Sequence, residues 1–148
     1  MRELIYAMRF HGHAEPVGSA GNILRATTTA HGSSLTTTLT ADGISTTFQT
    51  IDGGVAEFTS EVTFTGETSF QEIGAIRFGN GNALHFSTIG SGYLGPADDA
   101  ARRQGAVMWR VDRGEGRLAG ATGLITSNFF VSERLEVTDH HFGVLLLP

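Results

Sequence analysis

Asp139 and His141, in the segment TDHHF, have the residue types and the spacing for acid–base chemistry. They are two residues apart, so in an extended strand both side chains point to the same face. A carboxylate beside an imidazole can orient the ring and raise its basicity, which suits a general base. The structural alternative is a His141 that is only hydrogen-bonded in the interior.

Glu72, in the segment FQEIGAIRF, lies among Phe70, Ile73 and Ile76. If its side chain points inward, the loss of water raises the pKa of its carboxyl group toward the range useful for proton transfer at neutral pH. Exposure of Glu72 to solvent is the alternative. The predicted catalytic residues are therefore Glu72, Asp139 and His141.

Aromatic and polar side chains on neighbouring segments are candidates for contact with a substrate. Trp109 alternates with valines, which indicates a core or cavity-lining position. Asn128 shares a strand face with Phe130, and a buried amide must be hydrogen-bonded, so it would hold a ligand carbonyl or tie down a loop. The predicted substrate-binding residues are Trp109, Asn128, Phe130, His85 and Tyr93.

The segment HGH places His11 and His13 on one face of a strand. If the first and last strands are neighbours, His140 or His141 approaches them, and the cluster resembles a cupin-like metal site. Pro16 suggests that the strand is already ending, so the alternative is a pair of surface histidines. We predict no metal and keep the metal site as an alternative.

The stretch GEGRLAGATGLITSNF, residues 114–129, tests whether the chain binds a phosphate. A dinucleotide loop requires G-x-G-x-x-G before a helix, and the Walker motif requires a lysine. The glycines here have a different spacing, the following LITSNFFVS has strand composition, and the chain has no lysine. The stretch is therefore predicted to be a tight hairpin at RGEG, followed by a strand in which glycines allow close approach or bending of the backbone.

The elements that must position these residues are short strands. Runs rich in threonine, valine, isoleucine and phenylalanine alternate with glycine turns such as ADG and GNGN, which is typical of β-strands and hairpins. Evenly spaced strands favour an all-β, antiparallel, closed or nearly closed barrel of about eight main strands. Proline, early acids and late arginines predict one short helix over Pro96–Gln104.

Composition excludes several classes of function. The 148 residues suit one domain, 1–148, and the net charge of -5 argues against nucleic-acid binding. Without lysine or cysteine the chain cannot form a Schiff base or use a thiol nucleophile. No apolar run is long enough to span a membrane and no signal peptide is evident, so we expect a cytoplasmic protein without membrane contact.

The C-terminal half resembles the small bacterial barrels of the allene-oxide-cyclase-like superfamily. The resemblance covers roughly residues 70–148. It rests on a G-x-G-x-L-x-G hairpin, a further glycine and a final H-x-x-x-x-x-x-P strand. The matching residues are Gly114, Gly116, Leu118, Gly120, Gly123, His141 and Pro148. The resemblance implies a barrel that binds an apolar substrate and steers its cyclisation, and it implies a possible homodimer; a shared fold does not transfer the chemistry.

We predict a cofactor-independent cyclase or isomerase that acts on a polyketide- or lipid-like substrate. The barrel would fold the substrate into a reactive shape, and the ionisable residues would move protons. A non-catalytic carrier or sensor of a lipophilic ligand is the first alternative. A cupin-like metal enzyme is the second.

Overall fold

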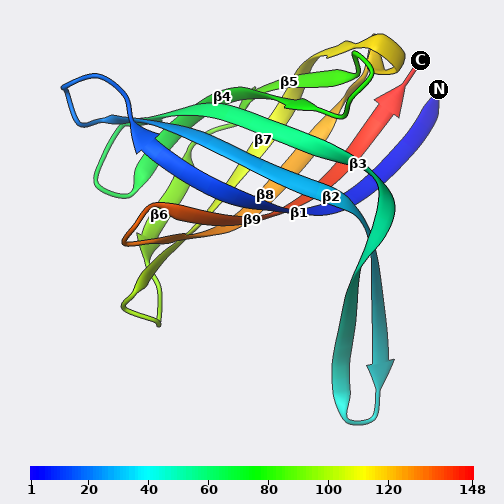
Figure 1. Ribbon diagram of the computed structural model, residues 1–148, viewed down its shortest axis with the longest axis horizontal. Coiled ribbons are helices and arrows are strands. Elements are labelled where there is room, and N and C mark those ends of the chain that lie inside the picture. The colour runs from blue at the N-terminus through cyan, green and yellow to red at the C-terminus, as the bar shows by residue number, and fades with distance from the viewer.

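The threonine- and valine-rich runs form nine antiparallel strands in a computed structural model, which describes all residues, 1–148 (Figure 1). The strands are β1 (Arg2–Pro16), β2 (Ile23–Thr40), β3 (Gly43–Phe64), β4 (Ser69–Arg77), β5 (Ala83–Thr88), β6 (Gly92–Pro96), β7 (Arg102–Glu115), β8 (Thr122–Ser132) and β9 (Glu136–Leu147). No helix in the structure has the length and apolar character needed to cross a membrane.

The sheet closes on itself into a ring of eight strands. The first and last strands, β1 and β9, pair along most of their length, and β3 pairs with β4 to close the other side. The short β6 lies outside this ring order and bridges β4 and β7. The prediction of an all-β, antiparallel, closed or nearly closed structure of about eight strands is confirmed.

The predicted helix over Pro96–Gln104 is wrong. This segment is a tight turn between β6 and β7, with Pro96 and Arg103 already paired in the hairpin. Asp99 makes the turn, because its carboxylate accepts from the Ala101 amide and its carbonyl accepts from the Arg102 amide. Proline followed by acids suits a turn as well as a helix start, and only the strand pairing decides between them.

The glycine-rich stretch connects two paired strands, but both the turn and the second strand lie later than predicted, because Arg113, Gly114 and Glu115 still belong to β7. A single 3₁₀ turn, Gly116–Leu118, follows β7, and β8 begins at Thr122. Gly116 has φ +63°, a left-handed conformation that glycine adopts without strain. No helix follows it, so the stretch lacks the helix N-terminus that a phosphate loop requires.

Aromatic side chains fill the interior of the ring. Trp109 and Phe10 are fully buried, and Phe58 packs between Phe86 and His141. Burial of each such apolar side chain contributes roughly 1.5–3 kcal/mol, so this cluster is a major source of stability. Through Phe58 the cluster also borders a cavity inside the ring.

Strands β2 and β3 continue past the ring as a two-stranded hairpin, seen at the lower right of Figure 1. The register shifts between His31 and Ser33, and beyond this bulge the pairs run from Ser33–Thr50 to Thr40–Gly43. We call residues 33–50 the arm. None of the buried core residues lies within it.

Candidate functional site

The ring encloses a largely apolar cavity of about 400 Å³. That volume suits a small molecule, since ligand pockets typically measure about 300–1,000 Å³. Lining residues from the β1–β2 and β8–β9 connections, such as Gly21 and Leu135, place its mouth at that end of the ring. The apolar lining comes mainly from Leu24, Ala26, Phe58, Val62, Phe64, Phe70, Leu94, Phe129, Val131 and Val137.

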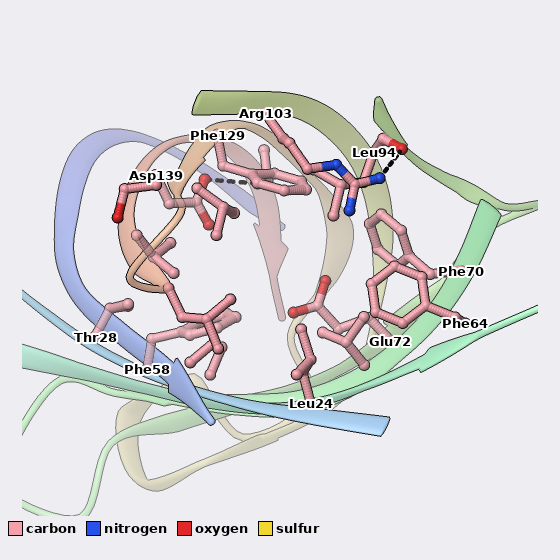
Figure 2. Close-up of a pocket in the computed structure, with 18 of the residues that line it drawn as sticks. Leu24, Thr28, Phe58, Phe64, Phe70, Glu72, Leu94, Arg103, Phe129 and Asp139 are labelled. Atoms are coloured by element: carbon pink, nitrogen blue, oxygen red, sulfur yellow. Dashed lines mark hydrogen bonds between the residues drawn. The ribbon is translucent and has the colours of Figure 1, made fainter. Parts of the chain in front are cut away.

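Glu72, on β4, points into this cavity from one wall (Figure 2). Its Oε1 accepts a hydrogen bond of 2.5 Å from Ser60 Oγ, and its Oε2 accepts one of 3.1 Å from Trp109 Nε1. Burial raises the pKa of the carboxyl group to about 8. The hydrogen bond from Ser60 lowers this pKa, the charge of Asp139 raises it, and the hydrogen bond from Trp109 lowers it. Glu72 is therefore mostly protonated at neutral pH.

Asp139, on β9, reaches the same cavity from the opposite side (Figure 2). Ser127 Oγ donates to its Oδ1 at 2.6 Å, and His141 Nε2 lies 2.8 Å from its Oδ2. The imidazole is fully buried and its ring lies 4.3 Å from that of Phe10. His141 does not line the cavity, so it acts on a ligand only through Asp139. The predicted Asp139–His141 pair is present, and it faces inward.

Three buried polar atoms around this pair have no hydrogen-bond partner: Tyr6 Oη, Thr28 Oγ1 and His141 Nδ1. Thr28 is among the residues that line the cavity. Burial raises the pKa of the Tyr6 phenol, and the negative charge of Asp139 raises it further. Tyr6 is thus a neutral hydroxyl held near a carboxylate.

Arg103 is the positively charged side chain in the cavity lining. It extends from β7 across the cavity, and its Nη2 donates to the Leu94 carbonyl at 3.1 Å (Figure 2). Glu133 supplies an acid near the mouth. An apolar ligand that carries a polar end can therefore keep that end at this charged rim.

Four of the five predicted substrate-binding residues, all except Trp109, lie on the outer surface of the ring and do not line the cavity. Asn128 is exposed, and Phe130 packs against the Arg102 guanidinium outside the ring. His85 bonds Glu115 and Arg113, and Tyr93 is 48% exposed.

The outward position of Asn128 and Phe130 follows from the face of β8 that points into the ring. On β8 the inward residues are Ser127 and Phe129, so Asn128 and Phe130 must point outward. Alternation along a strand tells which side chains share a face, but it does not tell which face is inside. Trp109 does face inward, yet it lies below the cavity and supports Glu72 instead of lining the wall.

The histidines of the HGH segment do not form a metal site. His11 and His13 are exposed on the outside of β1, where His11 Nδ1 lies 3.3 Å from Thr138 Oγ1. Partial burial lowers the pKa of His11, and the charges of Arg9 and His140 lower it further. The first and last strands are neighbours as expected, but no group of three histidine or carboxylate side chains is arranged to hold a metal ion.

Sequence reasoning missed the serines that hold the two carboxyl groups. Ser127 lies opposite His141 in the β8–β9 register, and Ser60 lies beside Glu72 on the adjacent β3. Both serines occupy inward positions, which become visible only when the register of the neighbouring strands is known. The chain offered no local motif for either residue.

Comparison with protein-family models, curated proteins and solved structures found no match. The resemblance to the allene-oxide-cyclase-like superfamily therefore stays a prediction. Any function must be argued from the site itself.

Proposed function

We propose that this protein is a cofactor-independent isomerase or cyclase that binds an apolar small molecule inside the ring and moves protons with Glu72 and Asp139. The observation that carries the proposal is the placement of two buried carboxyl groups on opposite walls of one apolar cavity. Carboxyl groups rarely lie in such surroundings for stability alone, because burial of the charged form is costly.

The two groups differ in a way that suits an acid and a base. With a pKa of about 8, Glu72 carries its proton at neutral pH and can donate it to a substrate oxygen. Asp139 accepts a hydrogen bond from Ser127 Oγ on Oδ1, and His141 Nε2 lies 2.8 Å from its Oδ2, so both oxygens are held in place at the cavity wall. As Asp139 removes a proton from a carbon next to a carbonyl, Glu72 gives one to the carbonyl oxygen, and an enol results. Where a second double bond is conjugated with the enol, Asp139 returns its proton to the far carbon of that system and Glu72 takes back the enol proton, so the double bond has moved and both carboxyl groups are restored.

The cavity contributes by holding the substrate. Its walls are aromatic and aliphatic, so they bind a flexible apolar chain and exclude water from the reacting atoms. Correct positioning alone can supply several kcal/mol of the reduction in barrier. The proposed substrate class is therefore an apolar carbonyl compound, polyketide- or lipid-like, that enters at the β1–β2 and β8–β9 connections.

Deuterium exchange tests this proposal before any substrate is identified. Apolar linear and cyclic ketones are incubated with the protein in D₂O, and deuterium at the carbon next to the carbonyl is measured by mass spectrometry. We expect exchange above the buffer rate for ketones that fit the cavity. Glu72→Gln and Asp139→Asn should each lower it by about 10²–10⁴-fold, the usual contribution of a general acid or base.

Glu57→Gln is the matched control, because Glu57 is an exposed carboxylate on β3. It should leave the exchange rate unchanged. Ketones that bind without exchanging, or exchange that survives both site variants, would reject the catalytic proposal.

One observation favours the non-catalytic carrier as the second candidate. Every oxygen of Glu72 and Asp139 already has a protein partner, which is also what purely structural carboxyl groups require. In that case native mass spectrometry of the purified protein finds a retained lipophilic ligand. The two site variants then change neither the identity of this ligand nor the amount bound.

A further inference from the structure

The arm has one apolar and one polar face. In the register of the hairpin, Leu35 lies opposite Phe48 and Leu39 lies opposite Ile44, with Thr37 and Thr46 between them. The intervening positions carry only serine, threonine, glutamine and glycine side chains. Successive residues point to opposite faces of a strand, so the arm is amphipathic.

The apolar face of the arm has no partner within the chain along most of its length. Leu39 is 83% exposed and Ile44 is 75% exposed at its outer end, and Leu35 is about half exposed. A lone two-stranded hairpin is only marginally stable in water. A protein that holds such a ribbon away from its ring, as in Figure 1, therefore needs something to cover it.

A second apolar surface lies on the outside of the ring. Ile5, Val144 and Leu124 stand side by side on β1, β9 and β8, and the next row contains Phe142 and Met108. All except Val144 are more than a third exposed. We call this surface the outer patch: Ile5, Ala7, Ala106, Met108, Leu124, Thr126, Phe142 and Val144.

The apolar face of the arm lies on the same side as the outer patch. The outward-facing Arg9 places its guanidinium 4.6 Å from the centre of the Phe48 ring. Ser33, on the same arm face as Phe48, donates from Oγ to the Ala7 carbonyl at 3.1 Å. The arm and the outer patch therefore meet at β1 and form the two sides of one concave surface. Two copies related by a two-fold axis can each place the arm on the outer patch of the other, so that both apolar surfaces are covered.

We propose that two copies of this chain form a dimer in which the apolar face of each arm packs on the outer patch of the other copy. This interface does not involve the cavity, so the test of the dimer does not depend on the proposed function.

The size and the charge of the two surfaces support a second copy as the occupant. Eight side chains on the arm face and eight on the patch, with their flanking residues, approach the roughly 20–30 residues per side of a stable interface. None of these side chains is charged, as is typical of an interface core. The only charge in the arm is acidic Asp42 at its tip, and the chain is acidic overall, which opposes attraction to an anionic membrane.

Sedimentation equilibrium of the full chain tests the dimer. We expect a particle of twice the 15.7 kDa chain mass. The variant L39D/I44D should raise the dimer dissociation constant by more than about 100-fold, because it places unpaired charges in an apolar interface. Leu124→Asp should do the same from the patch side.

Two control variants keep the test specific. T38D/S45D adds the same charges to the polar face of the arm, and Ile73→Asp replaces an exposed apolar residue on β4 outside both surfaces. Both should remain dimeric. Near-UV circular dichroism of buried Trp109 verifies that every variant is folded. A monomeric wild type, or a dimer that survives L39D/I44D, would overturn the proposal, as would a monomer that binds phosphatidylcholine–phosphatidylglycerol vesicles through the arm.

Discussion

Trp109 Nε1 donates a hydrogen bond to Glu72 Oε2 across the interior of the ring, at 3.1 Å. The two residues belong to β7 and β4, which do not pair with each other. The bond therefore links two strands that are separated by β5, through a carboxyl group that is 6% exposed and lines the cavity. The protonation state of Glu72 must consequently affect both the stability of the fold and the chemistry of the cavity.

The first prediction concerns the pH dependence of stability. The pKa of Glu72 rises from an ordinary value of 4.5 in the unfolded chain to about 8 in the folded protein. Between these values the unfolded chain loses its proton and the folded protein keeps it, so this residue makes the protein less stable as pH rises. The slope approaches about 1.4 kcal/mol per pH unit. Glu72→Gln should remove this contribution, which urea unfolding from pH 4 to pH 9 measures.

The difference between wild type and Glu72→Gln isolates this one group from all others. It should change through pH 4.5–8 and stay constant outside that range. Glu57→Gln, at an exposed position, should give a flat difference. A flat difference for Glu72→Gln as well would mean that Glu72 has an ordinary pKa.

The second prediction concerns the hydrogen bond from Ser60. This bond lowers the pKa of Glu72 because it stabilises the carboxylate. Ser60→Ala should therefore raise the pKa of Glu72 above its value of about 8. The carboxyl carbon of Glu72, assigned by its loss in Glu72→Gln, reports the titration in ¹³C NMR. Ser45→Ala, on the exposed arm, should leave the titration where it is, and an unchanged or lower pKa in Ser60→Ala would contradict the bond.

The strand content and ring closure follow from local patterns in the sequence. Glycine turns separate runs with strand composition, and the even spacing of these runs favours a closed antiparallel sheet. The predicted helix over Pro96–Gln104 is wrong, because the side chain of Asp99 can cap a turn as readily as a helix. The projection of the arm depends on the bulge between His31 and Ser33, for which the sequence carries no distinct pattern.

The part of the site formed by two residues of a single strand could be predicted from the sequence. Asp139 and His141 alternate with outward residues, so their pairing follows from their spacing once that face is inside. The choice of face failed on β8, because Leu124 and Phe130 are apolar although they point outward. Contacts between strands distant in sequence, such as that between Trp109 and Glu72, depend on the register of the whole ring.

The third prediction concerns Gly143, where a side chain has no room. A Cβ at this position would collide with the ring of Tyr6 on the neighbouring β1. Gly143→Ala should therefore destabilise the protein by about 1–3 kcal/mol, the usual cost of overpacking. Gly54→Ala is the control, since a Cβ there meets nothing within 4 Å. Thermal unfolding of both variants measures the difference, and equal stability would contradict the tight packing of Tyr6.

The fourth prediction concerns the coupling between Asp139 and His141. Asp139→Ala leaves the Ser127 hydroxyl and the His141 ring nitrogen buried without a partner, which should cost about 3–5 kcal/mol. His141→Phe keeps the ring packing against Phe10 but removes the bond to Asp139. The double variant should then lose less than the sum of the single variants, with a coupling free energy of about 0.5–3 kcal/mol.

The exposed pair Arg110 and Asp112, 3.0 Å apart, provides the matched cycle for this measurement. Alanine substitutions there should give a coupling free energy below about 1 kcal/mol, because water screens a surface ion pair. Urea unfolding of both sets of variants at one pH gives the two values directly. If the buried pair couples no more strongly than the surface pair, His141 does not hold Asp139 in place. The base in the proposed reaction would then be Asp139 alone, oriented by Ser127.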